Sequence, residues 1–176
     1  MKVLITGGTG FIGSRLALRY LEDGRPVRIL GQENTAAESA NREKLEDLGA
    51  DVVLGSITDS AVLEDAVDGV EIVFHLAAAQ HEMNVPDERF RAVNVDGTRK
   101  VLEAGSRAGV KRFVHGSTIG VYGPSHGVVD EAAPCRPDNI YGKTKLEGER
   151  VALGYSDRLP VTVIRIPEVY GPGDRR

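Results

Sequence analysis

Two residues of the sequence, Tyr141 and Lys145, are spaced so that they could carry out proton transfer. They are four positions apart, which places both side chains on one face of a helix. A free phenol has a pKa of about 10, and a nearby ammonium group favours its ionised form. Tyr141 could therefore take a proton from a substrate hydroxyl while the adjacent carbon gives up a hydride. The alternative is a surface tyrosine and an exposed lysine with no shared function.

Two hydroxyl groups precede this pair along the chain. Ser117 and Thr118 follow the apolar run at residues 113–115. Open parallel sheets bind their ligands at the carboxyl ends of the strands. A hydroxyl there could donate a hydrogen bond to the reacting oxygen and orient it toward Tyr141, whereas the alternative is a pair of hydroxyls that caps a turn. The order hydroxyl, tyrosine, lysine favours the catalytic interpretation.

A glycine-rich loop near the start of the chain has the spacing of a phosphate-binding turn. Gly7, Gly10 and Gly13 lie between a β-branched run and a helical pattern. Gly7 permits the sharp turn, Gly10 lets the backbone approach a pyrophosphate, and Gly13 lets the helix pack close to the strand. The helix N-terminus then offers unpaired N–H groups to the phosphates. This context predicts dinucleotide binding, against the alternative of a tight turn that binds nothing.

The end of the second apolar run should distinguish NAD from NADP. A carboxylate there selects NAD and an arginine nearby favours NADP. Gly31 and Gln32 occupy these places, and Glu33, which could reach a ribose, could equally be a solvated loop charge. Arg28 is expected to point off one face of the strand. The sequence favours NAD slightly and does not exclude NADP.

These residues need a scaffold, and the alternation of short apolar runs with longer helical patterns predicts which one. The runs are nearly uninterrupted, as expected of strands covered on both faces. We predict strands at residues 2–6, 27–30, 51–54, 71–76, 112–115 and 161–166. We predict helices at residues 11–23, 36–48, 60–67, 86–108 and 139–153. The result is an α/β fold, a Rossmann-like doubly wound parallel sheet of about six strands with helices on both faces. Residues 117–138 form a long connection, which is often functional.

Composition excludes several other classes of protein. The 176 residues are 41% hydrophobic and 27% charged, the range of one globular domain. The net charge of −4 gives no electrostatic footprint for nucleic acid or an anionic membrane. No apolar run approaches the ~20 residues of a membrane-spanning helix, and the start lacks a signal peptide, so we expect a cytoplasmic protein. Cys135 is the single cysteine, which leaves no intrachain disulfide and no cysteine cluster for a metal.

Together these motifs resemble a known family. The chain is similar to the extended short-chain dehydrogenase/reductases, especially the NAD-dependent epimerase/dehydratase group that acts on nucleotide sugars. The resemblance covers essentially the whole chain. It rests on six ordered segments, at residues 6–13, 74–78, 94–98, 117–123, 141–145 and 169–173.

The resemblance implies a role for each matching residue. Thr118 would be the catalytic hydroxyl, Tyr141 the acid/base and Lys145 its partner, which also holds the nicotinamide ribose. Asn94 would stabilise the active-site helix or take part in a proton relay. The cofactor would contact Gly7, Gly10, Phe11, Ile12, Gly13, Ile57, Leu76, Ala77, Ala78, Asn94, Ser117 and Pro167.

The chain also departs from the family pattern at three places. The aspartate that often binds adenine is replaced by Ser56, so the backbone amide of Ile57 would have to serve. The Asp-Glu pair that dehydratases carry after the catalytic threonine is replaced by Ile119 and Gly120. The acid and the base that dehydration needs are therefore missing there, which argues against dehydratase activity. Glu168 stands where sugar-nucleotide enzymes place asparagine, and a carboxylate there would repel a diphosphate unless it is paired or protonated.

The resemblance leaves the function of this chain open between three interpretations. Family members are about twice as long, so we expect residues 1–176 to be a cofactor domain without the substrate domain. The first interpretation is an epimerase or oxidoreductase of a hydroxyl or keto carbon, of a sugar or nucleotide sugar. The others are a dinucleotide-binding sensor and an inactive fragment. A homodimer through the predicted helices 86–108 and 139–153 is plausible by resemblance.

Overall fold

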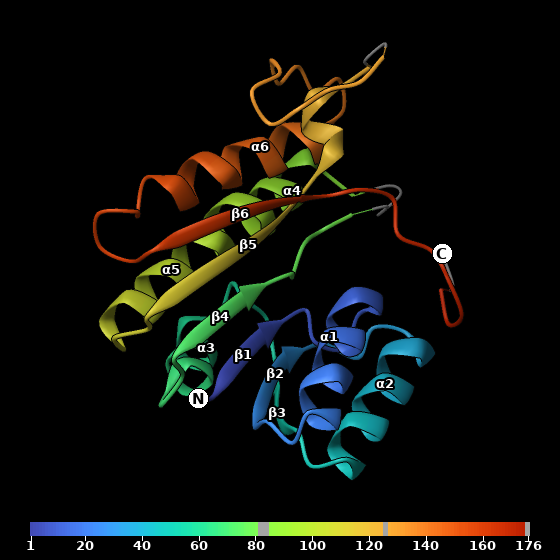
Figure 1. The fold of residues 1–176 in the computed structure, drawn as a ribbon, viewed down its shortest axis with the longest axis vertical. Helices are drawn as coiled ribbons and strands as arrows, with labels where there is room; N and C mark the ends of the chain where they lie inside the picture. Colours follow the sequence, from blue (N-terminus) through green and yellow to red (C-terminus); the bar gives the residue numbers. More distant parts are fainter. Residues whose placement is uncertain (81–84, 125–126, 175–176) are drawn as a thin grey trace.

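A single parallel sheet forms the centre of the molecule. The structure is a computed structural model, which describes residues 1–80, 85–124 and 127–174. The strands lie in the order β3-β2-β1-β4-β5-β6, and every neighbouring pair is parallel (Figure 1). Their bounds are β1 Val3–Thr6, β2 Val27–Gly31, β3 Asp51–Leu54, β4 Ile72–His75, β5 Arg112–Thr118 and β6 Val161–Ile166.

Helices cover both faces of this sheet. The α-helices are α1 Phe11–Glu22, α2 Ala36–Asp47, α3 Ser60–Val67, α4 Asp87–Arg91, α5 Thr98–Arg107 and α6 Ile140–Leu153. A π-helix, η1 Ala92–Gly97, joins α4 to α5, and a 3-10 turn, η2 Ile119–Tyr122, follows β5. Helices α1 and α2 lie on one face, and α3, α5 and α6 lie on the other (Figure 1). The predicted Rossmann-like doubly wound fold is confirmed.

The alternation of side chains along the strands builds two separate cores. Val3 and Ile5 of β1 pack toward α1 and α2, and Leu4 packs toward α3 and α5. All three are fully buried. Burial on both faces explains why the strands appear in the sequence as uninterrupted apolar runs.

The strand order places the ligand-binding edge of the sheet at β1. Successive strands run outward from β1 to β2 and β3, and then on its other side from β4 to β6. A crevice opens at the carboxyl ends of the strands where this order reverses. Thr6, the last residue of β1, lies opposite Leu30 of β2 and His75 of β4. The loops after these residues are therefore neighbours at one edge.

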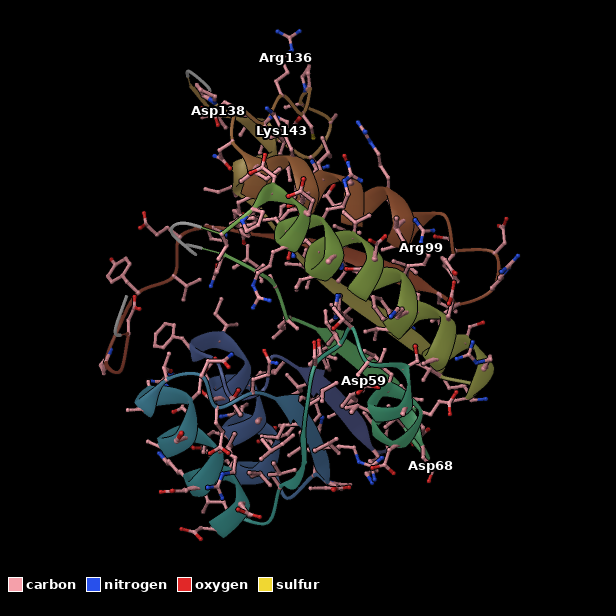
Figure 2. The ribbon with its side chains drawn as sticks, turned by 180° about the vertical axis from the view of Figure 1, so that it is seen from behind. Asp59, Asp68, Arg99, Arg136, Asp138 and Lys143 are labelled. Carbon is pink, nitrogen blue, oxygen red and sulfur yellow. The ribbon has the colours of Figure 1, made fainter. Side chains whose placement is uncertain are left out.

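Polar caps set where several helices begin. Thr35 forms a capping box with Glu38 at the start of α2. Asp59 accepts hydrogen bonds from two amides in the first turn of α3, and Figure 2 shows it beside that helix. Asn139 accepts from the amide of Gly142 at 2.8 Å and starts α6. This last cap fixes the first turn of the helix that carries Tyr141.

The structure corrects two predicted elements. Strand β5 extends to Thr118 rather than ending at residue 115, because residues 116–118 pair with residues 164–166 of β6. The single helix predicted over residues 86–108 is interrupted by η1. The wider π-turn lets Asn94 contact two other segments while Gly97 packs against Ile57, where an added Cβ would lie 2.7 Å from the Ile57 Cδ1 atom.

Candidate active site

The three glycines of the phosphate loop occupy different environments. Gly7 follows β1 with a φ of +70°, a backbone conformation that favours glycine. A Cβ on Gly13 would lie 2.8 Å from the carbonyl carbon of Gly7, so this position permits close packing of α1 on the loop. A Cβ on Gly10 would meet only the Gly7 oxygen, at 3.2 Å. Gly10 is thus the least crowded of the three, directly before the first turn of α1.

The first turn of α1 carries the properties of an anion-binding helix terminus. Gly10 is its N-cap and makes no side-chain cap, and the turn has no acidic residue. Phe11 and Ile12 follow, and 38% of Ile12 is exposed. Arg15 stacks over the Phe11 ring at 4.7 Å and donates to the carbonyl of Pro172 in the segment after β6. The positive end of the α1 dipole thus faces the carboxyl edge of the sheet.

A second wall of this edge is the segment that follows β4. Leu76, Ala77 and Ala78 are half-buried. The Ala77 amide donates to the Thr6 hydroxyl at 3.2 Å, and an added Cβ on Gly7 would lie 2.8 Å from the Ala77 nitrogen. The predicted cofactor-contacting segment is therefore in direct contact with the glycine loop.

Asn94 holds the next residue of that segment. Its side-chain oxygen accepts from the Ala79 amide at 2.8 Å, and its nitrogen donates to the Ala79 carbonyl at 3.1 Å and to the Thr144 hydroxyl at 3.0 Å. Asn94 is buried, and Thr144 lies on α6 beside Lys145. Asn94 thus links the segment after β4 to α6, the helix that carries Tyr141 and Lys145, and its predicted role stays a prediction.

Lys145 occupies a buried position at the end of β5. Only 2% of the residue is exposed, and its ammonium group donates to the Gly116 carbonyl at 2.5 Å. Burial lowers the pKa of Lys145 to about 8, and the negative charge of Glu149 opposes this shift. An ammonium group is thus held at the carboxyl end of β5, one helical turn after Tyr141.

The two hydroxyls at the end of β5 differ in their hydrogen bonding. The Thr118 hydroxyl accepts from the Gly120 amide at 3.1 Å, which leaves its own proton to donate. The Ser117 hydroxyl is buried and has no hydrogen-bond partner among the described residues. The Thr118 oxygen therefore caps the following turn, as the alternative interpretation predicted. The Ser117 hydroxyl makes no such contact and is available to bind a ligand.

Helix α6 brings Tyr141 to the same edge. Tyr141 lies in the first turn and is half-buried. Its neighbour Gly142 packs on η2, where an added Cβ would lie 2.9 Å from the Gly120 oxygen. Thr118, Tyr141 and Lys145 are thus carried by elements in mutual contact, although they lie up to 27 positions apart in the sequence.

The residues proposed to select the cofactor are occupied with other contacts. Arg28 binds Asp51 at 2.7 Å and donates to three carbonyls at the C-terminus of α3. Glu33 pairs with Arg42 at 3.2 Å. Gly31 is the last residue of β2, and an added Cβ would lie 2.5 Å from Thr9. The end of β2 therefore presents no unpaired arginine for a 2′-phosphate.

Thr9 is a residue of the glycine loop that the sequence analysis missed. Its hydroxyl donates to the Gln32 carbonyl at 2.9 Å, and its own carbonyl accepts from Asn41 at 2.8 Å. Thr9 thereby ties the loop to β2 and α2. It lies inside the glycine motif, but its partners are more than 20 positions away, so the motif alone gives no signal for this contact.

The remaining predicted residues lie at the two sides of the edge. Ile57 is buried under η1, and the Ser56 hydroxyl closes the turn there through Thr58 at 2.8 Å. Pro167 and Glu168 are exposed directly after β6. Glu168 makes no ion pair or hydrogen bond with the described part of the chain.

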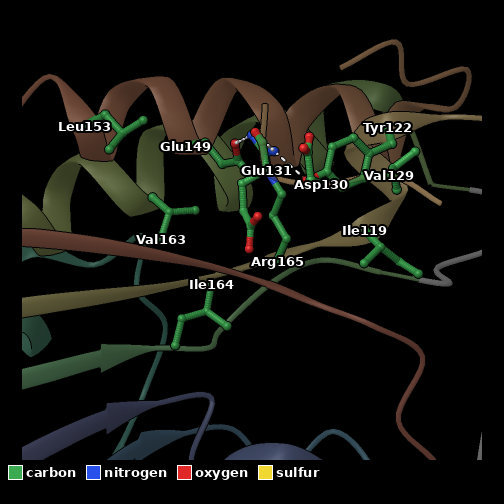
Figure 3. Close-up of a pocket in the computed structure, with 10 residues that line it drawn as sticks. All are labelled: Ile119, Tyr122, Val129, Asp130, Glu131, Glu149, Leu153, Val163, Ile164 and Arg165. Atoms are coloured by element: carbon green, nitrogen blue, oxygen red, sulfur yellow. Dashed lines mark hydrogen bonds and ion pairs between the residues drawn. The ribbon is translucent and has the colours of Figure 1, made fainter. Parts of the chain in front are cut away.

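A cavity of about 620 Å³ lies apart from these residues, between β6 and α6 (Figure 3). Arg165 and Glu149 form a two-pronged ion pair at 2.9–3.0 Å in its wall. Figure 3 shows Val163 and Arg165 directed toward α6 and Ile164 directed away. Neither Tyr141 nor Lys145 lines this cavity, so it is distinct from the candidate active site.

Within the described ranges, no helix combines the length and apolarity needed to cross a bilayer. In the same residues, no group of three or more His, Cys, Asp or Glu side chains gathers as a metal site would require.

Comparison with known proteins identifies the family. Residues 3–176 match the family described as "NAD dependent epimerase/dehydratase family". The chain belongs to this family. Its members are enzymes, and the prediction of an NAD-dependent enzyme is confirmed at the level of the family.

Similar proteins act on different compounds. A 3β-hydroxysteroid dehydrogenase/Δ5→4-isomerase of Mycobacterium tuberculosis is 37% identical over 99% of this chain and 48% of its own length. The structure of UDP-glucuronic acid 4-epimerase from Bacillus cereus with NAD has a TM-score of 0.88 at 31% identity, over 99% of this chain and 59% of that one. A dTDP-glucose 4,6-dehydratase from Streptomyces venezuelae, also with NAD, has a TM-score of 0.88 at 33% identity, over 98% and 57%. The chain thus spans about half the length of the relatives it matches.

Proposed function

We propose that this chain binds NAD and carries the catalytic groups of an enzyme that transfers a hydride at a hydroxyl or keto carbon, as an epimerase or oxidoreductase. The observation that carries the proposal is the buried ammonium group of Lys145 at the carboxyl end of β5. It lies one helical turn after Tyr141 and bonds to Gly116, the residue directly before Ser117 and Thr118 on β5. A buried lysine without a carboxylate in hydrogen-bond contact is costly, which favours a functional role.

The residues at the edge of the sheet fit a dinucleotide. The absence of a side chain at Gly10 and the uncapped start of α1 suit a pyrophosphate, and the Ser117 hydroxyl, which has no partner among the described residues, could bind a polar group of the ligand. Bound NAD would supply the hydride acceptor. The proposed contacts come from Gly7, Gly10, Phe11, Ile12, Gly13, Ile57, Leu76, Ala77, Ala78, Asn94, Ser117 and Pro167. Both arginines near the end of β2 are paired, which supports NAD over NADP.

The roles that we propose for Lys145, Tyr141 and Thr118 depend on their charges and on the protons that they can donate or accept. Below a pH of about 8, Lys145 is an ammonium ion, which favours the phenolate form of Tyr141. The phenolate oxygen takes the proton of the substrate hydroxyl. Thr118 keeps a proton that it can donate to the same substrate oxygen, since its lone pair is what binds the Gly120 amide.

A sugar or nucleotide sugar is the first candidate substrate class, by similarity to the UDP-glucuronic acid and dTDP-glucose enzymes. A second candidate is a secondary alcohol without a diphosphate, such as a hydroxysteroid. The exposed and unpaired Glu168 favours this second class, because its carboxylate repels a nearby diphosphate. The 37% identity to a hydroxysteroid dehydrogenase points the same way.

The test of the proposal is hydride transfer with UDP-glucuronic acid, dTDP-glucose and a 3β-hydroxysteroid, alongside calorimetric titration of NAD. An oxidoreductase releases NADH, whereas an epimerase returns the hydride, so it is detected by transient bound NADH and by its epimerised product. Tyr141→Phe should abolish hydride transfer and leave NAD affinity nearly unchanged, since only the phenol proton is lost. Lys145→Met should impair both, since it removes the charge and the proposed ribose contact. Tyr155→Phe is the matched control, because Tyr155 bonds to Glu103 away from the site. An active Tyr141→Phe variant would contradict the assignment of Tyr141.

We expect the 176-residue chain to bind NAD but to turn over slowly. Positioning of a substrate contributes ~7–11 kcal/mol to catalysis. About half the length of each relative lies outside the matched region, and we propose that such a region supplies the substrate contacts. The homodimer through residues 86–108, which form α4, η1 and α5, and residues 139–153, which form α6, stays a prediction.

A further inference from the structure

We propose that His75 is a positioning residue for the dinucleotide, because a directional chain of hydrogen bonds through its ring fixes the segment at residues 76–79 against the glycine loop. The chain runs from Thr6 on β1 through His75 on β4 to Thr98 at the start of α5. The inference rests on the proposed function, in which NAD lies against this segment.

The chain of hydrogen bonds is buried along its whole length. Thr6 lies opposite His75 in the register of β1 and β4. The Thr6 hydroxyl is 2.8 Å from Nδ1 of His75, and Nε2 is 2.9 Å from the Thr98 hydroxyl. The three residues are at most 1% exposed, so water does not compete for these bonds.

The direction of each bond follows from the number of protons available. The Thr98 hydroxyl donates its only proton to the Asn94 carbonyl at 2.8 Å. It must therefore accept from His75, which places the imidazole proton on Nε2. Nδ1 is then a lone pair that accepts from the Thr6 hydroxyl, and that oxygen is left to accept from the Ala77 amide at 3.2 Å. Each donor in this series of hydrogen bonds therefore has one acceptor.

Only neutral imidazole satisfies this arrangement. A proton on Nδ1 would face the proton of the Thr6 hydroxyl, so one of the two would lose its partner. The titratable groups that face His75 are the ring of His115, at 5.4 Å between centroids, and the ammonium of Lys145. Burial and the charge of Lys145 lower the pKa of His75 to about 3. The ring is therefore neutral and of one tautomer at physiological pH.

The chain acts on the cofactor-contacting segment through two anchors. At the first, the Thr6 hydroxyl fixes Ala77, whose nitrogen lies where a Cβ of Gly7 would reach. At the second, the Asn94 side chain fixes both backbone groups of Ala79. Both anchors meet at η1, because Thr98 bonds to the Asn94 carbonyl. His75 thus connects Thr6, directly before the glycine loop, to η1 through Thr98. In η1, Asn94 bonds to Thr144 of α6.

The experiment removes the hydrogen bond at one end of the series, at Thr98, and measures the effect at the other end, at Ala77. Thr98→Val keeps the shape of the side chain but leaves the Nε2 proton of His75 without an acceptor. We expect NAD affinity by calorimetry to fall about tenfold and the Ala77 amide to exchange its hydrogen faster in the absence of NAD. Thr98→Ser, which keeps the hydroxyl, should restore both to wild-type values.

A control separates positioning from simple loss of stability. Val101 is fully buried one turn later on α5, so Val101→Ala should lower the melting temperature yet leave NAD affinity and Ala77 exchange unchanged. The tautomer of His75 is read independently from long-range nitrogen–proton correlations, with the proton expected on Nε2.

Three outcomes would overturn the inference: an Nδ1 proton, unchanged Ala77 exchange in Thr98→Val, or equal effects of Thr98→Val and Val101→Ala. A wild-type chain that does not bind NAD contradicts the proposed function instead. In that case the hydrogen exchange of the Ala77 amide and the tautomer of His75 still show whether the hydrogen bonds fix residues 76–79.

Discussion

At the scale of single residues, the glycine loop separates structural from binding requirements. Gly7 needs its positive φ, and Gly13 needs its close contact with the loop, so both are required for the fold itself. Gly10 has an ordinary backbone conformation, with a φ of −72°, and an added Cβ would make a single tight contact, 3.2 Å from the Gly7 oxygen. A side chain at Gly10 therefore disturbs the fold less than one at Gly7 or Gly13, which makes Gly10 the best of the three as a probe of ligand binding.

Gly10→Val should weaken NAD binding at least about tenfold, because the new side chain would occupy the space of the pyrophosphate. It should also lower the melting temperature slightly, because its Cβ makes a tight contact with the Gly7 oxygen. Calorimetry with NAD and NADP measures the effect and also the preference between the two cofactors. Gly105→Ala is the control, since its added Cβ makes an ordinary 3.5 Å contact in α5. Equal NAD affinity of Gly10→Val and the wild type would rule out binding at this loop.

Spacing predicts only the part of the site that is local in sequence. Tyr141 and Lys145 lie on one helix, so their shared face followed directly from the helical period. The contacts of His75 could not be predicted, because Thr6 lies 69 positions before it and Thr98 lies 23 positions after it. The sequence shows these residues inside motifs without showing that they touch.

At the scale of elements, the pair of Glu149 on α6 and Arg165 on β6 joins the helix that carries Tyr141 and Lys145 to the outer strand of the sheet. Glu149 is nearly fully buried, and Arg165 also donates to the Tyr122 hydroxyl at 2.8 Å. The Glu149 carboxylate raises the pKa of Arg165 above its ordinary value and opposes the lowering of the pKa of Lys145. The same residue therefore acts on packing and on the charge of the candidate site.

Glu149→Gln should destabilise the fold by about 2–3 kcal/mol, since it leaves a partly buried guanidinium without its carboxylate. The double variant Glu149→Met with Arg165→Met should lose less, because both desolvation costs disappear together. Urea unfolding of the three proteins measures the difference. A double variant less stable than Glu149→Gln would show that the arginine makes more favourable contacts than this pair alone.

Element prediction succeeded where the apolar period is regular and failed where tertiary contacts override it. The six strands and the helices at residues 36–48 and 60–67 were found within about one residue, except that β5 continues through Gly116, Ser117 and Thr118. These residues are not apolar, and it is their pairing with β6 that makes them a strand. The π-helix η1 could not be predicted from the local sequence. Its wide turn is stabilised by contacts of Asn94 and Gly97 with segments that are distant in the sequence.

At the scale of the whole molecule, two histidines in the centre of the sheet make the fold sensitive to acid. His75 and His115 face each other on β4 and β5 and are fully buried. Burial lowers the pKa of both, and the two ring nitrogens of His115 have no partner among the described residues. The unfolded chain therefore binds more protons than the folded chain below the ordinary histidine pKa of about 6.5.

The sign of the effect follows from this difference in proton binding. The part of the stability that depends on the two histidines is fully present above pH ~6.5 and falls as the pH drops toward the folded-state pKa values, by up to about 1.4 kcal/mol per pH unit for each histidine. Between pH 6.5 and 5, most carboxylates do not yet titrate, so the histidines dominate the slope. His115→Leu should halve the slope and should not reduce stability at pH 7, because the polar atoms that it removes have no hydrogen-bond partner among the described residues. Urea unfolding at several pH values tests this, and an unchanged slope in His115→Leu would show that His115 is not protonated more readily in the unfolded chain.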